Sequence, residues 1–344
     1  MINELLATYK LPPLPETREE MRDVLQREMY GTMPTDPYTW EVSAPRDIEC
    51  RYADFDVREV TLSVHVRGRD FSWPVKTALH RDGVKRPFFI VNNFRPDFPD
   101  RYLPVEEILD NGFDLLWFCY KDVTSDDGDF TNGLADIFVG TNDREPTAPG
   151  KLILWAWANS RVMDYALTLP MLDGGHGAVV GHSRLGKTSL VTGLFDDRFR
   201  YVISNNAGCA GESAARITEG EKIADITKNF PFWFCPNCFQ YAGHHEAMPF
   251  DQHFLLAAQY PKNLIVGGSI LDTWCDTRAQ YLTLCAASPF YEKNGKSGFV
   301  HPDRLPETGE HFHDGTIGFH IKPGEHSLFR RDWLEYMDYI RKHL

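Results

Sequence analysis

The sequence contains no apolar run near the length of about 18 residues that a membrane-spanning helix needs. Its first residues lack the basic segment and the apolar stretch that together make a signal peptide. The seven cysteines are an odd number and are scattered through ordinary sequence, which indicates reduced thiols rather than a disulfide framework. We therefore expect a cytoplasmic protein with no membrane partner.

Positive charge is also scarce. Lys and Arg total 36 against 49 Asp and Glu, which gives a formal net charge of -13. Because binding to nucleic-acid phosphates needs a basic face, this balance argues against nucleic acid as a partner. Heptads and internal repeats are absent as well, and the sequence gives no indication of the oligomeric state.

What the sequence does contain is enough apolar material for a large core. Of its 344 residues, 42% are hydrophobic and 13% are aromatic. This length fits one large α/β domain or two small ones. No Pro- or Ser-rich linker divides the chain, so we expect a single domain over residues 1–344, with a helical extension over residues 1–45.

Short apolar runs alternate with helical patterns after a β-hairpin. Residues 59–66 and 71–79 alternate apolar and polar side chains, which predicts the hairpin. Nearly continuous apolar runs, typical of buried parallel strands, predict further strands at 88–93, 113–118, 178–181, 201–204 and 263–268, and helical patterns are found at 17–28, 152–169, 188–195 and 330–343. This order predicts an α/β fold with a mostly parallel central sheet, helices on both faces and the antiparallel hairpin at one edge.

The strand at 178–181 runs into a tight turn at Ser183 and then into a helix. This geometry lifts a serine hydroxyl above the sheet and directs the first helical N–H groups at a developing oxyanion. Gly181 permits the tight turn, and Arg184 and Lys187 place two cations beside the hydroxyl. A simpler interpretation is that Ser183 only caps the helix near Lys187. The glycine and the two cations favour a catalytic nucleophile.

A family resemblance becomes specific at this turn. Gly181-His182-Ser183-Arg184-Leu185-Gly186-Lys187 resembles the G-(C/H)-S-R-x-G-K signature of the glucuronoyl esterases, carbohydrate esterase family 15. Further similar segments are Tyr30-Gly31, Trp155-Ala156-Trp157, Asn229-Phe230-Pro231, Asp272-Thr273-Trp274 and Gly324-Glu325-His326. The resemblance covers roughly residues 30–344. It implies an α/β-hydrolase fold and a nucleophilic Ser183.

A serine nucleophile needs an imidazole to accept its proton, and α/β-hydrolases place that histidine on a loop after the last strand. His326 lies in a Gly-containing loop before the terminal helix, and it matches the family's catalytic histidine. His320, in the apolar run 317–321, is instead expected to be a buried hydrogen-bonding residue.

The catalytic acid is the point where this sequence departs from the resemblance. Many glucuronoyl esterases carry Glu or Asp where this chain has Asn206. An amide can orient an imidazole but cannot stabilise its charged form as a carboxylate does. Asp272, which follows the strand ending near residue 269, is our candidate; Asp276 is the runner-up and Glu212 the third choice. A simpler role for Asp272 is to cap a helix over residues 273–286.

The resemblance also implies groups that bind the oxyanion and the substrate. The backbone N–H and the guanidinium of Arg184 would face the oxyanion, and residues 92–94 are a further place for a donor. Lys187 would hydrogen-bond to sugar hydroxyls, and Trp274 would pack near the sugar ring. The simpler interpretations are that Lys187 is an ordinary surface lysine and that Trp274 is a core residue. The acidic stretch 122–145 reads as a mobile loop that shapes the alcohol side of the site.

We expect no metal and no cofactor. The pair Cys235 and Cys238 has no second CxxC at zinc spacing, so structural thiols are the better interpretation. His244-His245 and His311-Phe312-His313 read as loop histidines rather than ligands.

These features together imply a serine carboxylic-ester hydrolase that acts on 4-O-methyl-glucuronoyl esters through an acyl-enzyme on Ser183. Its partner would be a uronate ester, and in a cytoplasm that ester would be a small molecule or an oligosaccharide. Two alternatives stay open. One is an acetylxylan or other short-acyl carbohydrate esterase; the other, motivated by Asn206, is a catalytically weak carbohydrate-binding relative.

Overall fold

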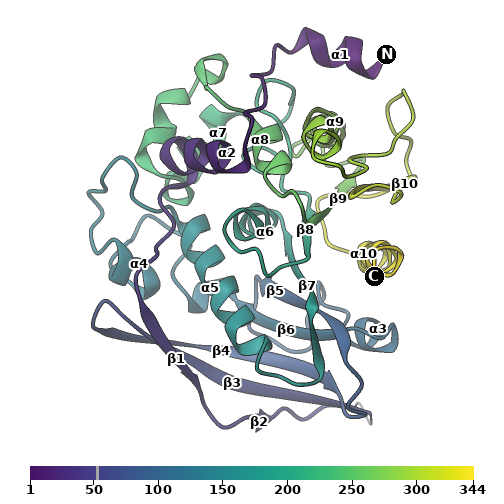
Figure 1. Ribbon diagram of the computed structural model, residues 1–344. Helices are drawn as coiled ribbons and strands as arrows, with labels where there is room; N and C mark the ends of the chain where they lie inside the picture. The colour runs from purple at the N-terminus through teal and green to yellow at the C-terminus, as the bar shows by residue number, and fades with distance from the viewer. Residues whose placement is uncertain (52–53) are drawn as a thin grey trace.

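The computed structural model describes residues 1–51 and 54–344. In this part of the chain eleven strands form one sheet in the order β1-β3-β4-β6-β5-β7-β8-β9-β11-β10, with β2 beside β3 (Figure 1). The strands are β1 (Tyr38–Val42), β2 (Arg46–Asp47), β3 (Phe55–Val66), β4 (Arg69–His80), β5 (Arg86–Asn93), β6 (Asp114–Cys119), β7 (Leu172–His182), β8 (Tyr201–Asn205), β9 (Asn263–Ser269), β10 (His311–Phe312) and β11 (Ile317–Lys322).

The middle of the sheet is parallel and its two edges are antiparallel. Strands β6, β5, β7, β8, β9 and β11 all run in the same direction. The predicted hairpin is present as β3 and β4, and the two-residue strand β10 pairs antiparallel with β11 at the opposite edge. Because the carboxyl ends of parallel strands meet at one edge, the loops after β5, β7, β8, β9 and β11 share one rim.

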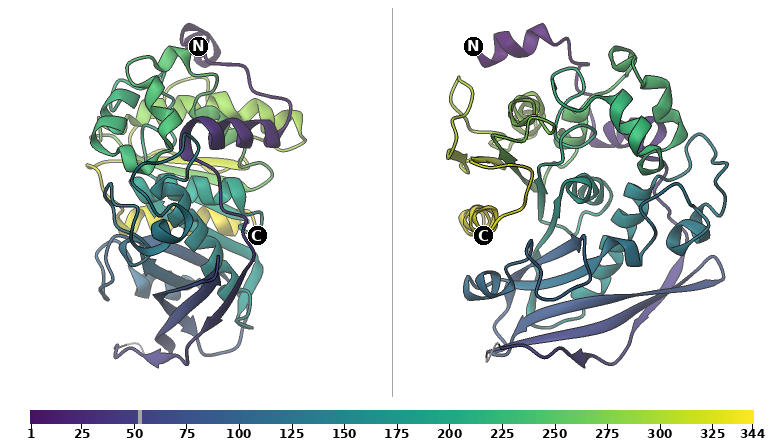
Figure 2. Two further views of the ribbon diagram at one scale, coloured as in Figure 1. Left: turned by 90° about the vertical axis from the view of Figure 1, so that its left-hand side faces the viewer. Right: turned by 180° about the vertical axis from the view of Figure 1, so that it is seen from behind.

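Helices cover both faces of the sheet. They are α1 (Ile2–Thr8), α2 (Arg18–Leu25), α3 (Val105–Asp110), α4 (Gly133–Phe138), α5 (Lys151–Ala166), α6 (Arg184–Phe195), α7 (Ile223–Asn229), α8 (Gln252–Ala257), α9 (Thr277–Lys293) and α10 (Arg330–Lys342). One hydrophobic cluster joins α3 and α10 to one face of the sheet, and a larger cluster joins α5, α6, α8 and α9 to the other. The view from behind in Figure 2 shows the two helical layers with the sheet between them. The predicted fold class is confirmed.

The N-terminal extension predicted over residues 1–45 is helical only in part. α2 begins with a capping box at Thr17 and continues into a π turn over Gln26–Tyr30. Residues 38–42 form β1, which pairs with β3, because their alternating half-buried and exposed side chains suit an edge strand. The second half of the extension therefore joins the sheet.

Arg18 attaches the extension to the helical layer. Its guanidinium donates hydrogen bonds to the carbonyls of Gly193 and Leu194, in the last turn of α6, at 3.1 Å each. It also donates to the carbonyl of Ala258, just after α8, at 2.6 Å. Helix C-termini leave such carbonyls without intrahelical donors, so Arg18 satisfies two helix ends at once.

Two predicted helix starts are wrong. α6 begins at Arg184 rather than at residue 188, since the tight turn leaves Ser183 directly before the first helical residue. α9 begins at Thr277 rather than at residue 273, because the Asp276 side chain accepts the Ala279 N–H at 3.0 Å and caps the helix there.

The acidic stretch 122–145 is also more structured than a loop, since it contains α4. Its first part folds on itself: the Asn132 side chain accepts the Ser125 N–H and donates to the Asp129 carbonyl. Across the ranges given above, no helix is both long enough and apolar enough to cross a membrane.

Candidate active site

Ser183 lies between β7 and α6 with φ 57° and ψ -127°, a conformation that an L residue rarely adopts. Such backbone strain persists only where the surroundings enforce it, and it concentrates at functional sites. The Ser183 side chain makes no capping hydrogen bond to α6, so the capping interpretation finds no support.

Two glycines make this turn possible. A Cβ on Gly181 would lie 1.9 Å from the Leu185 carbonyl oxygen, and one on Gly186 would lie 2.8 Å from Ser204 Oγ on β8. No side chain fits at either position without moving the backbone or the neighbouring strand. The spacing G-x-S-x-x-G thus follows from the close passage of α6 over the ends of β7 and β8. Arg184 is the first residue of α6, and its N–H therefore has no intrahelical acceptor.

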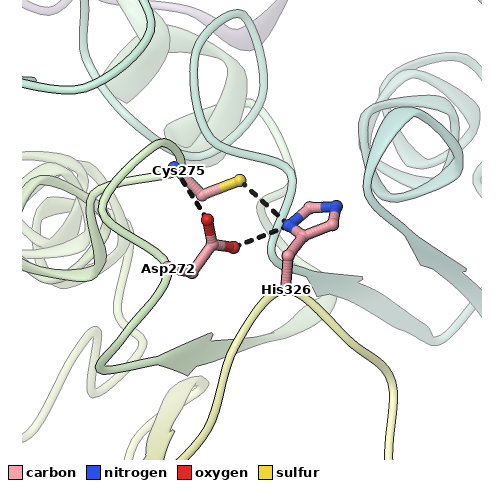
Figure 3. A group of neighbouring side chains, drawn as sticks. All are labelled: Asp272, Cys275 and His326. Atoms are coloured by element: carbon pink, nitrogen blue, oxygen red, sulfur yellow. Dashed lines mark hydrogen bonds and ion pairs between the residues drawn. The ribbon is translucent and has the colours of Figure 1, made fainter.

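Asp272 and His326 meet at the same rim (Figure 3). Asp272 follows β9 and His326 follows β11, and His326 Nδ1 lies 2.6 Å from Asp272 Oδ2. The other oxygen of Asp272 accepts the Cys275 N–H at 3.2 Å. The Cys275 thiol lies 3.5 Å from His326 Nδ1 and 3.1 Å from the Asn206 carbonyl. The carboxylate is buried, whereas 41% of the His326 side chain is exposed, so the imidazole can reach a bound molecule.

The pKa of Asp272 is lowered from its usual value. Burial alone raises it, but the hydrogen bond and charge of His326 together with the Cys275 donor outweigh burial. The carboxyl is therefore held as a carboxylate. Burial, together with the adjacent Asp272 charge, raises the pKa of the Cys275 thiol well above its usual range, which keeps that sulfur protonated.

His326 lies against His182, the residue directly before Ser183. Its ring packs against that of His182, with centroids 4.6 Å apart. Burial and the neighbouring His326 lower the pKa of His182 to about 3, so its ring is neutral and does not oppose a charged His326. No direct hydrogen bond between Ser183 and His326 is found in residues 1–51 and 54–344; such bonds are often long without substrate and tighten in the complex.

Asn206 and the other two candidates for the acid make their contacts elsewhere. The Asn206 side chain is buried and donates to Ser269 Oγ at 2.8 Å. The Asp276 carboxylate caps α9, and Glu212 is fully buried, where it accepts from Ser204 Oγ at 2.6 Å. Only Asp272 of the predicted carboxylates contacts His326 in the described part of the chain. Its simpler role as a helix cap belongs to Asp276.

Arg184 is held in place by a residue that the sequence did not single out. Its guanidinium pairs with Asp126, which is 6% exposed and also accepts from Trp233 Nε1 and the Tyr120 hydroxyl at 2.8 Å each. The guanidinium lies 4.8 Å from the centre of the Trp233 ring. Asp126 thus fixes both the cation beside Ser183 and the indole that it packs against.

Residues 92–94 offer no free backbone donor at Phe94. The Phe94 N–H is taken by Asn93 Oδ1 at 2.9 Å. Phe94 instead places its ring 6.0 Å from that of His182 and 5.8 Å from the Arg184 guanidinium. Its contribution to the site is packing.

Lys187, Glu221 and Trp274 gather on the other side of the rim. Lys187 is 4% exposed and donates to the Ala207 carbonyl, so it is not an ordinary surface lysine. Trp274 is 52% exposed, so it is not a core residue either. The Glu221 N–H donates to the Trp274 carbonyl at 2.9 Å. Burial raises the pKa of Glu221, and Lys187 and a hydrogen bond from the Trp274 side chain partly offset this.

One further expectation from the sequence is met. His320 is buried and its Nε2 lies 2.7 Å from Asp332 Oδ1, as expected of a core histidine with a partner. Cys235 and Cys238 are buried free thiols, and burial raises the pKa of Cys235 to about 11. By contrast, His311 was expected in a loop but begins strand β10.

Asp126, Glu221 and His182 are the site residues that sequence reasoning did not assign. Asp126 is one of seven acidic residues in its stretch, and its partner Arg184 is 58 residues away. Glu221 lies in a polar segment with no periodic pattern. His182 stands inside the recognised motif, and that position was the only available signal for it.

The chain is similar to known carbohydrate esterases. The family model described as "Glucuronyl esterase, fungi" matches residues 105–295. The carbohydrate esterase MZ0003, from an unknown prokaryotic organism, is 32% identical over 242 residues, which are 70% of this chain and 56% of that protein. A 4-O-methyl-glucuronoyl methylesterase from Hypocrea jecorina is 28% identical over 86% of this chain and 60% of its own length. The chain therefore spans little more than half the length of these curated relatives.

Solved structures are similar over nearly the whole chain. A promiscuous CE15 esterase from a marine bacterial metagenome superposes with a TM-score of 0.86 at 26% identity, over 95% of this chain and 91% of its own. A glucuronoyl esterase from Solibacter usitatus gives a TM-score of 0.85 at 26% identity, with the same coverage.

Proposed function

Because the chain belongs to the glucuronoyl esterase family, we propose that it is a serine carboxylic-ester hydrolase that cleaves esters of 4-O-methyl-glucuronate. The observation that carries the proposal is the 2.6 Å contact between His326 and the buried carboxylate of Asp272, at the rim where the strained Ser183 turn also lies. A neutral imidazole with one nitrogen fixed by a carboxylate is the base that a serine nucleophile needs.

In the first half of the reaction, Ser183 Oγ attacks the ester carbonyl carbon while His326 Nε2 accepts the hydroxyl proton. Asp272 holds the Nδ1–H and stabilises the imidazolium. The oxyanion of the tetrahedral intermediate faces the Arg184 N–H and guanidinium, and one such donor contributes about 3 kcal/mol to the transition state. The imidazolium then gives its proton to the departing alcohol, and a glucuronoyl ester of Ser183 remains.

In the second half, water replaces the alcohol. His326 Nε2 takes a proton from the water as its oxygen attacks the acyl carbon, and a second oxyanion forms at Arg184. Collapse of this intermediate returns the proton to Ser183 Oγ and releases the free glucuronate.

The sugar would lie against Lys187, Glu221 and Trp274. An ammonium and a carboxylate side by side supply both donors and acceptors for sugar hydroxyls, and the exposed indole offers an apolar face to the ring. Because both charged groups are buried, replacing hydroxyls on the sugar should weaken binding strongly.

The test is a substrate panel of benzyl glucuronate, methyl galacturonate and p-nitrophenyl acetate with wild type and Ser183→Ala. We expect benzyl glucuronate to be preferred, methyl galacturonate to be slower, and all turnover to be lost in Ser183→Ala. Preference for the acetate would favour the short-acyl esterase instead. Absence of turnover with uronate binding retained would favour the carbohydrate-binding relative.

We also propose that the enzyme works in a reducing, cytoplasmic compartment, on small esters or oligosaccharides. The seven free thiols, six of them buried, support this. Cell fractionation followed by thiol labelling of the native protein tests it, and recovery outside the cytoplasm would contradict it.

A further inference from the structure

A second group of titratable side chains lies at the sheet edge, away from Ser183. His311 belongs to β10, His313 follows two residues later, and Glu335 lies on α10. β10 and α10 are neighbours in space (Figure 1). Side chains two residues apart on an extended segment point to the same face, and the two imidazole rings are stacked with centroids 4.8 Å apart.

Both rings face the same carboxylate oxygen. His311 Nδ1 lies 3.1 Å and His313 Nε2 lies 3.8 Å from Glu335 Oε2. The first distance is an ordinary ion pair or hydrogen bond, whereas the second is too long for one. The three atoms thus surround a small space without closing it.

His313 has a buried nitrogen that nothing satisfies. Its side chain is 7% exposed, and its Nε2 has no hydrogen-bond partner within the described residues. Buried polar nitrogens almost always have a partner, so an orphan aimed at a carboxylate and a second imidazole needs an explanation. A ligand between these groups would provide one.

The surroundings suit a cation. The adjoining surface hollow, of about 350 Å³, is also lined by Asp314, Asp338 and Lys342. The Lys342 ammonium is paired with Asp314, and Arg341 with Asp338. Arg331 Nε lies 4.0 Å from Glu335 Oε1, which leaves Oε2, the oxygen nearer the two rings, for a ligand. The hollow leaves room for the water that an open metal site retains.

We propose that His311, His313 and Glu335 bind a divalent transition-metal ion of the zinc class, with water as the fourth ligand. Two imidazole nitrogens and one carboxylate oxygen are a set that zinc binds in proteins, at about 2.0–2.2 Å each, which separates tetrahedral ligand atoms by about 3.3 Å. The distances of 3.1 and 3.8 Å found here bracket that separation.

The ion would join two elements that flank the proposed catalytic histidine. β10 and β11 precede the loop that carries His326, and α10 follows it. A bond from β10 to α10 closes that stretch of chain into a ring, which reduces the ways in which the loop can open. The ion would therefore be structural and would lie outside the reaction itself.

The group of side chains around the proposed catalytic histidine is a poorer site for the same ion. Asp272, Cys275 and His326 also lie close together. A metal there would have to break the 2.6 Å contact between Asp272 and His326 and displace the proton of a buried thiol.

The experiment is calorimetric titration of the full chain with Zn²⁺, repeated with Co²⁺ to record the visible absorption of a four-coordinate site. We expect one ion per chain and a Zn²⁺-dependent rise in Tm. His311→Ala and Glu335→Gln should each weaken binding at least about tenfold. His311 is 60% exposed, so its replacement leaves the fold intact.

His65→Ala is the matched control, because His65 is also exposed and pairs with a carboxylate, Asp70, at 2.7 Å, but no third ligand lies beside them among residues 1–51 and 54–344. It should bind Zn²⁺ as wild type does. Binding that is unchanged in both His311→Ala and Glu335→Gln would overturn the proposal. Binding that is lost in Cys275→Ser would also overturn it, since the ion would then lie at Asp272, Cys275 and His326.

Discussion

Asp272 is the single residue on which the proposed chemistry most depends. Its carboxylate fixes the Nδ1–H tautomer of His326 and receives a second hydrogen bond from the Cys275 backbone. The neighbouring strand end carries Asn206, whose amide is committed to Ser269. The imidazole therefore has one carboxylate partner in the described structure.

Asp272→Asn should lower kcat by about 10³- to 10⁴-fold, because the amide cannot stabilise the imidazolium and favours the wrong tautomer. The measurement is kcat on benzyl glucuronate, with a Tm to confirm folding. Asp276→Asn is the control, since Asp276 caps α9 without touching His326 and Asn caps a helix about as well as Asp does; it should change both stability and kcat little. Full activity in Asp272→Asn would remove Asp272 from the mechanism.

Asp126→Asn should lower kcat about 10- to 100-fold with a smaller change in KM, because a guanidinium without its carboxylate no longer faces the oxyanion in a fixed position. Steady-state kinetics separate the two constants. Asp127→Asn serves as the control: Asp127 is exposed and bonds to Ser125 rather than to Arg184. Equal effects of the two variants would show that Asp126 has no special role.

At the residue scale, the sequence indicated the residues that stand at ends of strands. Ser183, Asp272 and His326 each follow an apolar run, and that local pattern marks the position. Asp126 and Glu221 could not be found in this way, because they belong to the site through contacts with residues far away in the sequence. Asn206 indicated that an acid should be sought elsewhere, and in the structure Asp272 is the carboxylate that contacts His326.

At the element scale, the loop that carries Asp126 depends on the first residue of α5. Lys151 is fully buried, and its ammonium donates to Thr124 Oγ1 at 2.8 Å and to the Asp129 carbonyl at 2.7 Å. Burial lowers the pKa of Lys151 to about 8, and nearby Asp127 and Asp129 only partly offset this. Lys151 thus links α5 to the loop that positions Arg184.

This lowered pKa predicts a pH dependence of stability. Between about pH 8 and 10.5 the unfolded chain keeps a proton on Lys151 that the folded chain has released, so the free energy of unfolding rises with pH in that window. Below about pH 8 both states are protonated and the folded state bears the full cost, on the order of 3 kcal/mol.

The contribution of Lys151 to the free energy of unfolding is measured by urea unfolding of wild type and Lys151→Met from about pH 7 to about pH 10.5, which includes the whole window in which the two states differ in protonation. The wild type should gain stability relative to Lys151→Met as pH rises. Lys121→Met, which changes an exposed lysine near the same loop, should run parallel to wild type. Parallel curves for all three proteins would contradict the prediction.

Elements were predictable where the pattern is local and strong. The buried strands and the hairpin followed from apolar runs and alternation. The start of α9 did not, because the Asp276 cap competes with Asp272, which is an equally good capping residue by sequence. β10 has two residues and carries no periodic pattern at all.

At the scale of the whole molecule, the N-terminal segment and the helical layer form one body through Arg18. The three carbonyls that it satisfies lie at the ends of α6 and α8, and α6 begins at Arg184, directly after Ser183. Arg18→Ala should lower the free energy of unfolding by about 2–3 kcal/mol, since partly buried carbonyls lose charged donors.

The measurement is urea denaturation at pH 7. Arg22→Ala, one turn further along α2, is the control, because no side-chain hydrogen bond is found for Arg22 in the described part of the chain. Equal loss of stability in both variants would mean that helix propensity, rather than the three carbonyls, explains the effect.

The sequence predicted the class of sheet, but not the order of its individual strands. Right-handed crossovers and alternating strands and helices imply a parallel centre with both faces covered. The placement of β1 outside β3, and of residues 38–42 in the sheet at all, depends on contacts between distant segments that no local pattern reports.

The adjacent ends of β8 and β9 have a consequence for how the position of the proposed catalytic acid could change during evolution. Asn205 and Gly267 are paired across these strands, so the loops that carry positions 206 and 272 leave adjacent strand ends. A lineage that acquires a carboxylate at one position before losing it at the other never passes through an enzyme without an acid. Relocation of the acid between the two strands is therefore open to neutral drift, and the Asn at 206 is the mark such a history would leave.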